Sequence, residues 1–514
     1  RSSSSRAGRK VQALDYPLAI LSGVLLALSF PKFGQPALAW VALVPLLAAL
    51  GSAKGIQVQR AFGLGLATGA VAFAGTLYWI SEVMMTYGGL AWPTALAVNA
   101  LLVFYLAIFF GLFAVMAIRG ISISVTVGLV TTSAAWVVSE FGRGYLFGGF
   151  PWALLGYSQA EVLPVAQLAS VFGVYGISFL IVLVNGALAS IAVRVDRRRL
   201  TTGGVVLGIA VLIACWGQWR LSQNTLINEG EPVRVAMIQG NVAQDQKHDP
   251  GFRTSILDTY LSASRSAAAD GAKLLIWPES ALPLPFDQDV GTVVAIQNLA
   301  KETGSHILFG SEESEETDGF HYYNSAFHVG PTGIDRPTYR KIHLVPFGEY
   351  VPYRRFLFFA DKLVESVPDF SPGTETITFS MNGHRFSSAI CYEVVYPSLV
   401  RSAVLAGSEL LTTITNDAWF GRTSAPHQHF SQAAMRAIEQ GRYLVRAANT
   451  GISGVVDPYG RVLAQTELFE NARVVADVRW INVKTVYGWT GDLFVYLCLM
   501  LVICVLVFGV RASW

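Results

Sequence analysis

Residues 385–393 read RFSSAICYE, and this stretch decides how the second half of the chain is interpreted. A β-rich run at 385–390 ends at Cys391, and Tyr392 and Glu393 lead on into a helical stretch. A turn from strand to helix exposes a nucleophile and offers backbone N–H groups to an oxyanion. We therefore interpret Cys391 as a candidate nucleophile. The plainer interpretation of a lone cysteine is a small buried hydrophobic residue.

The positions of the other cysteines favour the first interpretation. Of the four cysteines in the chain, Cys215, Cys498 and Cys504 lie in apolar runs long enough to cross a membrane. Cys391 therefore has no disulfide partner in the expected water-soluble part. An unpaired thiol in an oxidising compartment is a liability unless it is buried or used in chemistry.

Two further expected strand ends carry isolated charges. Glu279 follows the apolar run 274–277, and Lys341 follows Thr338-Tyr339-Arg340. If they meet Cys391, the three groups form a centre for covalent catalysis. A thiol with a pKa of about 8.5 needs a base, which Glu279 would supply, and Lys341 would stabilise the negative oxygen of the intermediate. Taken singly, each charge is more often a solvated surface group.

Short β-rich runs alternate with helical stretches from Val233 onward, which predicts a layered α/β or α+β domain. The expected strands are 233–239, 274–277, 306–309, 324–329, 385–390 and 411–415. The expected helices are 253–269, 293–303, 397–405 and 429–446.

The first half of the chain is far more apolar. Over all 514 residues, 53% are hydrophobic and 14% charged, and the mean hydropathy is +0.45. This composition excludes a disordered, collagen-like or disulfide-scaffold protein. Uncharged runs near the length that crosses a bilayer, about 20 residues, predict eight membrane spans. They are 16–30, 35–50, 61–80, 94–118, 121–139, 162–193, 200–219 and 493–510.

The charge distribution predicts the orientation of these spans. Residues 1–220 hold 14 Lys and Arg against 5 Asp and Glu, whereas the remainder holds 23 against 30. With eight spans the basic excess falls on one side, which predicts that both termini are cytoplasmic. We expect a seven-span membrane domain at 1–220, an exported catalytic domain at 221–488 and a last span within 489–514. No basic stripe marks the soluble part, so we expect no nucleic-acid partner.

Four ordered motifs resemble those of the nitrilase, or carbon-nitrogen hydrolase, superfamily. They are Trp277-Pro278-Glu279, Tyr339-Arg340-Lys341 with the following His343 to Glu349, Ile390-Cys391-Tyr392-Glu393, and Thr415 to Phe420. The resemblance implies an α-β-β-α sandwich in which Cys391 is the acylated nucleophile, Glu279 the general base and later acid, and Lys341 the oxyanion stabiliser. It also implies that Glu349 is a second acidic residue beside this triad and that Tyr392 and Glu393 support the nucleophile.

Together with eight spans, these motifs make the whole chain resemble the apolipoprotein N-acyltransferase family of Gram-negative bacteria. The resemblance implies ping-pong transfer of an acyl chain from a membrane phospholipid, typically phosphatidylethanolamine, through a cysteine thioester. The acceptor would be the α-amino group of the N-terminal diacylglyceryl-cysteine of a lipoprotein. The implied location is the inner membrane, with a periplasmic catalytic domain. We expect no cofactor, since the sequence contains no G-x-x-x-x-G-K-[ST] loop and acyl transfer needs none.

Aromatic segments add candidate substrate contacts. The segment 141–157, rich in glycine and aromatic residues around Trp152, is expected at the membrane interface, either lining lipid entry or forming an aromatic belt. The segments 419–424, beginning at Trp419, and 356–359 are expected either to cap the site against water or to anchor the domain on lipid headgroups.

Three alternative assignments are weaker. His427 and His429 have no accompanying zinc motif, so we expect them to be structural and predict no metal. A membrane-tethered amidase would keep the triad and end each cycle with water. A transporter with an exported sensing domain predicts charged or Gly/Pro-broken spans near mid-membrane, whereas the expected spans are nearly free of charge.

Overall fold

The computed structural model describes residues 2–52, 56–247, 249–316, 319–350 and 369–508. The chain divides into two compact units. The first, the helical unit, comprises residues 1–82, 91–223 and 489–514. The second, the sheet unit, comprises residues 83–90 and 224–488, so that a short segment from the first half of the chain belongs to it.

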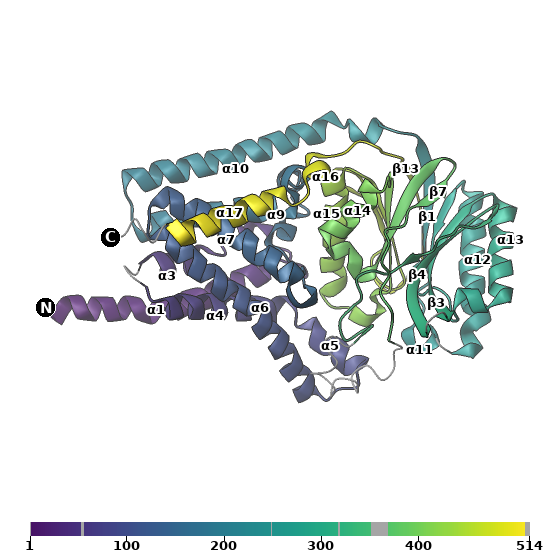
Figure 1. Cartoon of the computed structure of the whole chain (residues 1–514), viewed down its shortest axis with the longest axis horizontal. Helices are drawn as coiled ribbons and strands as arrows, with labels where there is room; N and C mark the ends of the chain where they lie inside the picture. The colour runs from purple at the N-terminus through teal and green to yellow at the C-terminus, as the bar shows by residue number, and fades with distance from the viewer. Residues whose placement is uncertain (1, 53–55, 248, 317–318, 351–368, 509–514) are drawn as a thin grey trace. The chain divides into compact units, whose positions relative to one another are not determined.

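The helical unit consists of apolar helices joined by short connections (Figure 1). Their bounds are α1 (Ser2–Leu28), α2 (Pro36–Ala39), α3 (Val44–Ser52), α4 (Val58–Thr76), α5 (Trp79–Thr86), α6 (Trp92–Ile121), α7 (Val125–Tyr145), α8 (Leu163–Ala166), α9 (Ala169–Val193), α10 (Arg197–Gln223) and α17 (Leu493–Phe508).

Four helices among the described residues are long and apolar enough to cross a membrane: Trp92–Ile121, Val125–Gly148, Ala169–Val193 and Arg197–Asn228. Helices α4 and α5, bent by 52° at a short break, bring the number to five if they act as one span. The remaining apolar helices, at 14–28, 36–52 and 493–508, are shorter. The structure therefore supports four or five of the eight expected spans by length.

The expected span 35–50 is broken between α2 and α3. The side chain of Asn185 lies at the break, where its Nδ2 donates to the carbonyl of Ala39 at 2.9 Å and its Oδ1 accepts from the N–H of Leu43 at 2.8 Å. Backbone groups released from a helix in an apolar environment must find partners within the protein. Here the buried side chain of Asn185 is the partner of two such backbone groups.

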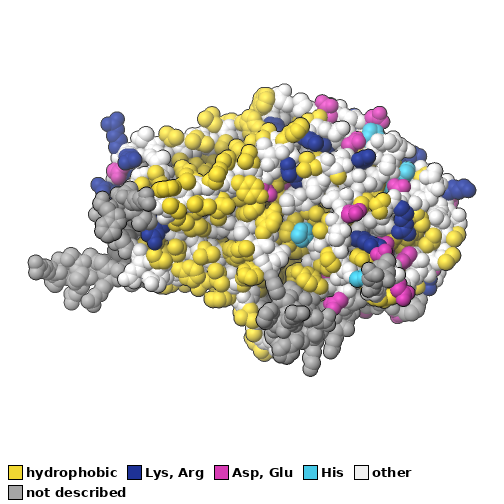
Figure 2. Space-filling model, viewed as in Figure 1, with side chains coloured by type: hydrophobic (Ala, Val, Ile, Leu, Met, Phe, Trp, Pro, Cys, Tyr) yellow, Lys and Arg dark blue, Asp and Glu magenta, His cyan; other side chains and the backbone are white. Residues whose placement is uncertain are grey.

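The face of the helical unit that Figure 2 shows is largely apolar. Val211 and Leu212 on α10 are 60% and 69% exposed, and Met500 and Val507 on α17 are each 54% exposed. Exposed aliphatic side chains over whole helices are typical of a surface that contacts lipid. The apolar helices thus agree with the membrane protein expected from composition.

Trp152, whose segment is expected at the membrane interface, is buried within the helical unit. It is 1% exposed and packs against Trp79, with ring centroids 5.3 Å apart. Its segment is fastened to α7, because Arg143 Nη1 donates to the carbonyl of Trp152 at 2.6 Å and Glu140 Oε1 accepts from the N–H of Leu155 at 2.6 Å. These two buried charges hold backbone groups that the loop would otherwise leave unpaired inside the unit.

The sheet unit contains two sheets. The first has the strand order β13-β1-β2-β3-β4-β5, with β6 also paired to β4; the second has the order β12-β11-β10-β9-β8-β7. The first-sheet strands are β1 (Pro232–Gln239), β2 (Leu274–Ile276), β3 (His306–Glu316), β4 (Phe320–Gly330), β5 (Gly333–Ile334), β6 (Tyr339–Arg340) and β13 (Ala472–Arg479). The second-sheet strands are β7 (Phe379–Met381), β8 (His384–Ile390), β9 (Leu410–Thr415), β10 (Leu444–Ala448), β11 (Gly454–Val456) and β12 (Val462–Gln465).

Helices lie on both sides of this pair of sheets (Figure 1). Helices α12 (Arg253–Ala269) and α13 (Val290–Thr303) lie beside the first sheet, and α14 (Pro397–Leu405) and α15 (Ala425–Gln440) lie beside the second. The core under α12 and α13 includes Tyr260, Trp277 and Phe309, all fully buried. Close packing of these rings fixes the strand that leads to Glu279.

All six expected strands are confirmed, but the expected helix 429–446 is wrong at its end. Helix α15 stops at Gln440 because Gly441 adopts the left-handed conformation, with φ 61°, that terminates helices. Residues 444–448 form strand β10, which pairs in parallel with β9. Strands β5, β7 and β11 to β13 were also not expected.

Candidate active site

Glu279, Lys341 and Cys391 each follow the end of a strand, as the sequence predicts. Glu279 follows β2 and Lys341 follows β6 in the first sheet, whereas Cys391 follows β8 in the second. All three side chains are buried, with exposures of 5%, 1% and 8%.

Lys341 stands between two carboxylates. Its Nζ lies 3.3 Å from Glu279 Oε1 and 2.8 Å from Glu349 Oε1. Asn324 bridges the same two oxygens, since its Nδ2 donates to Glu279 Oε1 at 2.7 Å and to Glu349 Oε1 at 2.8 Å. The structure therefore brings Glu349 beside the triad, and it adds Asn324, which the sequence motifs did not indicate.

The second oxygen of Glu279 is fixed by a backbone group. The N–H of Asn416 donates to Glu279 Oε2 at 2.8 Å, so the carboxylate is held on both sides. Gly310 on β3 permits this placement, because a Cβ there would lie 2.6 Å from Glu279 Cα. A carboxylate held so closely keeps its orientation when a proton is transferred to it.

The local electrostatics set the protonation states of Glu279, Lys341 and Cys391. Burial acts to raise the pKa of Glu279, but Lys341, Asn324 and the Asn416 N–H together hold the pKa below its usual value. Burial acts to lower the pKa of Lys341, but the neighbouring carboxylates hold it above its usual value. Burial and Glu279 raise the pKa of the Cys391 thiol, which Lys341 only partly opposes. The resting site therefore holds a carboxylate, an ammonium and a protonated thiol, which requires a base at the moment of attack.

Glu393 ties the lysine segment to the cysteine turn. It is fully buried, and its Oε1 accepts from Tyr339 Oη at 2.9 Å and from the N–H of Ile342 at 2.6 Å. Its Oε2 accepts from the N–H of Ile390 at 2.8 Å. Burial raises the pKa of Glu393 to about 7 despite these hydrogen bonds. One side chain thus connects the two strand ends that carry Lys341 and Cys391.

The backbone at Cys391 is held from a second direction. Cys391 has φ 51°, a left-handed conformation that is costly for a residue with a Cβ. His429 Nε2 donates to the Cys391 carbonyl at 3.1 Å. Arg446 Nη2 donates to His429 Nδ1 at 3.0 Å and to Asp417 Oδ2 at 2.8 Å.

This arrangement fixes the tautomer of His429. Burial and Arg446 lower the pKa of His429 although Asp417 opposes them, so the ring is neutral, and the proton lies on Nε2 because the Cys391 carbonyl can only accept. The Nε2 proton of His429 is therefore used in the hydrogen bond to the carbonyl of Cys391. The described residues contain no group of three His, Cys, Asp or Glu side chains that could hold a metal ion.

Replacing His429 with leucine is expected to lower kcat about 100-fold with little change in KM, because the Cys391 turn loses its carbonyl donor while no substrate contact is removed. His429→Gln places an amide N–H near the position of Nε2 and is expected to restore most of the rate. Acyl transfer kinetics and thermal melting of both variants test this. The matched control is His427→Leu, two residues earlier on α15. Equal losses in the Leu and Gln variants, with unchanged melting, would contradict the hydrogen-bond role.

Tyr392 and Trp419 lie in different surroundings. Tyr392 is buried beside Tyr396, with ring centroids 5.3 Å apart. Trp419 is half-buried, and its ring centroid lies 4.8 Å from that of Tyr87. The Oη of Tyr87 donates to the Ala418 carbonyl at 2.8 Å. The segment 83–90 thus braces the turn that carries Trp419, a contact that the sequence motifs did not indicate. The other expected cap, 356–359, lies outside the described residues.

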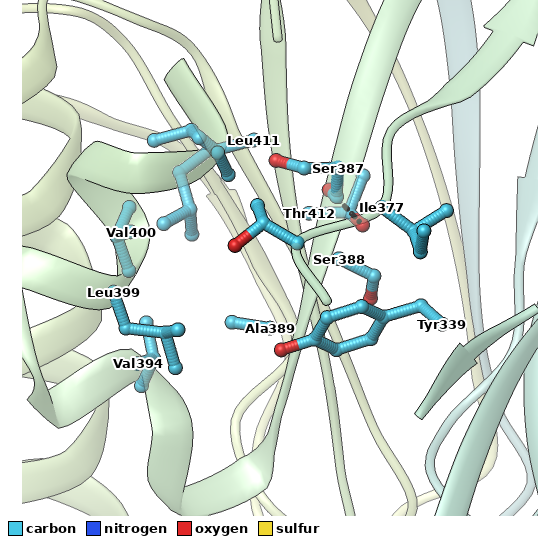
Figure 3. A pocket seen from close by; sticks show the side chains of 13 residues that line it. Tyr339, Ile377, Ser387, Ser388, Ala389, Val394, Leu399, Val400, Leu411 and Thr412 are labelled. Carbon is cyan, nitrogen blue, oxygen red and sulfur yellow. Dashed lines mark hydrogen bonds between the residues drawn. The ribbon is translucent and has the colours of Figure 1, made fainter. Parts of the chain in front are cut away.

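A small cavity lies behind the Glu393 turn, under α14 (Figure 3). Tyr339, Ala389, Val394 and Thr412 are among the residues that line it. Its volume of about 20 Å³ suits one water molecule and is too small for a fatty chain. This cavity therefore does not accommodate an acyl substrate.

Lys247 is a further buried cation at the site. It ends the short helix α11 (Gln244–Lys247), is 3% exposed, and its Nζ donates to the main-chain carbonyl of Glu279 at 3.3 Å. At the start of the same helix, Gln244 Oε1 accepts from Asn416 Nδ2 at 2.9 Å. No sequence motif gave Lys247 a role, since a lysine in a polar stretch is usually solvated.

Comparisons with known proteins were made for the whole chain. Residues 22–187 match a family model described as the apolipoprotein N-acyltransferase N-terminal domain, and residues 234–486 match one described as carbon-nitrogen hydrolase. The chain is 43% identical to an apolipoprotein N-acyltransferase of Geobacter metallireducens, over 94% of this chain and 93% of that protein. It is 36% identical to one of Methylococcus capsulatus, over 92% of each. A solved amidase of the nitrilase superfamily from Nesterenkonia matches at 22% identity and TM-score 0.38, over 49% of this chain and 93% of that chain.

Proposed function

Because the chain belongs to the apolipoprotein N-acyltransferase family, we propose that Cys391, Glu279 and Lys341 carry out its acyl transfer. The enzyme moves a fatty acyl chain from a membrane phospholipid, through a cysteine thioester, to the α-amino group of the N-terminal diacylglyceryl-cysteine of lipoproteins. The observation that carries the residue assignment is the buried cluster in which Lys341 Nζ lies 3.3 Å from Glu279 Oε1. Cys391 is close enough for both charges to affect its pKa.

The first half-reaction forms the thioester. Glu279 accepts the proton of the Cys391 thiol as the sulfur attacks the ester carbonyl of the phospholipid. The Lys341 ammonium stabilises the negative oxygen of the tetrahedral intermediate. When the intermediate collapses, the carbon–oxygen bond breaks and the leaving alkoxide takes the proton from Glu279, which releases a lysophospholipid.

The second half-reaction forms the amide. The acceptor amine attacks the thioester carbonyl and loses a proton to Glu279, and the intermediate expels the Cys391 sulfur, which takes that proton back. Glu279 is thereby returned as a carboxylate. Glu349 and Asn324 keep Lys341 and Glu279 in place through both halves, and Glu393 and Tyr392 hold the nucleophile turn.

Both substrates are lipids, which fits a membrane-bound enzyme. Moving a chain of sixteen carbons into water would cost about 12 kcal/mol at ~0.8 kcal/mol per CH₂. We propose phosphatidylethanolamine as the donor, because a zwitterionic headgroup needs no strongly basic surface. Trp419 and the segment after it are proposed to shield the thioester from water, and Trp152 is proposed to brace the neighbouring loop of the helical unit.

The layout of the chain in the membrane is proposed as follows. Residues 1–220 form a membrane domain of seven spans, residues 221–488 form a periplasmic α-β-β-α sandwich, and residues 489–514 carry the eighth span of an inner-membrane protein with cytoplasmic termini. The basic excess of the first 220 residues supports this orientation. The two sheets with helices on both sides support the sandwich.

Intact mass spectrometry after exposure to phospholipid alone tests the function. We expect the protein to gain one fatty acyl group, and adding a diacylated lipopeptide should remove it and yield a triacylated product. Release of free fatty acid without an N-acyl peptide would instead identify a hydrolase. Retention of no acyl group under single-turnover conditions would contradict the ping-pong mechanism.

A further inference from the structure

Lys247 is a buried ammonium that the acyl-transfer mechanism does not use. Its Nζ has one hydrogen bond among the described residues, the 3.3 Å contact with the Glu279 carbonyl. No carboxylate of the described residues lies within 4.0 Å of it, in contrast to Lys341, which has two. An ammonium carries three donors, so this contact satisfies the group only in part.

The charge on Lys247 persists at neutral pH. Burial lowers the pKa of Lys247 to about 8, and the more distant carboxylates of Glu279 and Glu312 limit the decrease. Burying a cation without a close counter-ion is unfavourable unless a ligand supplies the negative charge. The protein therefore maintains a positive group whose natural partner is an anion from outside the chain.

The position of Lys247 indicates which substrate supplies that anion. It contacts the main chain of Glu279, whose side chain is the proposed base, and it is as deeply buried as Lys341, Glu279 and Cys391. A lipid whose ester carbonyl reaches Cys391 therefore places the groups next to that ester close to Lys247. The phospholipid donor carries a phosphodiester near its acyl esters, whereas the thioester and the acceptor amine carry no anion at the reacting atoms.

We propose that Lys247 binds the phosphodiester of the acyl donor and so selects phospholipids over neutral esters. This inference rests on the proposed function and names the part of the donor that the site recognises. A charge-assisted hydrogen bond made in a dry site is stronger than one made in water. It orients the lipid with its ester facing Cys391 and is released with the lysophospholipid.

The test compares two donors in the full-length protein in detergent micelles. Acyl-enzyme formation is measured by single-turnover mass spectrometry with phosphatidylethanolamine and with p-nitrophenyl palmitate, which has no phosphate. Lys247→Met is expected to slow the reaction with phospholipid about 10- to 100-fold and the reaction with the neutral ester less than about threefold. Lys247→Arg, which keeps the charge, is expected to retain most of the phospholipid rate.

Controls separate this role from others. Lys273→Met removes an exposed lysine before β2 and is expected to leave the rate of acyl-enzyme formation unchanged with both donors. Equal losses with both donors in Lys247→Met would overturn the proposal and would assign Lys247 to the support of Glu279. Inhibition of the wild type by millimolar inorganic phosphate that is absent in Lys247→Met, together with an unchanged phospholipid rate in that variant, would assign a free-phosphate site instead. Wild-type protein that forms no acyl-enzyme with either donor would contradict the proposed function itself, whatever Lys247 does.

Discussion

Cys391→Ala is expected to abolish the acyl-enzyme and to lower acyl transfer by at least about 10³-fold, because alanine has no atom that can take the place of the attacking sulfur. The substitution removes a sulfur from a turn whose backbone is held by His429 and Glu393, so the fold should persist. The measurement is intact mass after incubation with phospholipid, together with the rate of N-acyl lipopeptide formation.

The matched control is Cys215→Ala on α10, which removes an exposed thiol from the helical unit and is expected to keep full acyl labelling. Unchanged thermal melting of Cys391→Ala would show that loss of labelling is chemical. Persistent acyl labelling of that variant would refute the assignment of the nucleophile.

Glu279→Gln is expected to lower the rate of acyl-enzyme formation by about 10³-fold. Glutamine keeps one oxygen, which accepts from either Asn324 Nδ2 or the Asn416 N–H but not from both, because these two groups donate to different oxygens of the carboxylate. Glu349 still neutralises Lys341, so the substitution removes the proton acceptor and one hydrogen bond while the rest of the cluster is kept. The Cys391 thiol, whose pKa burial raises, then has no base.

The pH dependence separates this explanation from a structural one. In Glu279→Gln only the small ionised fraction of Cys391 reacts, so the rate should rise about tenfold per pH unit below the thiol pKa. In the wild type, whose Glu279 has a pKa held below its usual value, the rate near neutrality should depend little on pH. Single-turnover rates between about pH 6 and 9 provide the test. Activity of the variant close to wild type would exclude Glu279 as the base, and Glu302→Gln, an exposed glutamate on α13, serves as the control.

The local pattern of the sequence predicted six of the strands and placed Glu279, Lys341 and Cys391 at strand ends. The strand before Glu279 is a short apolar run, and the strand before Cys391 ends in Ala389-Ile390, so both are visible within a few neighbouring positions. The end of α15 was missed, although Gly441 is a typical helix-terminating residue. Only pairing of 444–448 with β9 makes that segment a strand.

Residues that act through contacts with distant parts of the chain could not be predicted from the sequence. Asn324 lies 45 positions from Glu279 and 25 from Glu349, yet it donates to both. Nothing near residue 324 distinguishes this asparagine from a turn residue. Lys247 and His429 are similar cases, since each contacts the main chain of a proposed catalytic residue that lies more than thirty positions away.

The sequence by itself determined that the chain joins apolar helices to a hydrolase-like domain with a glutamate, a lysine and a cysteine at strand ends, because hydropathy and strand patterns are local properties. Only the tertiary structure decided which charges meet, in what protonation state, and that Trp152 is packed inside rather than exposed. Burial and charge proximity depend on segments brought together from distant parts of the chain, and a linear pattern carries no record of them.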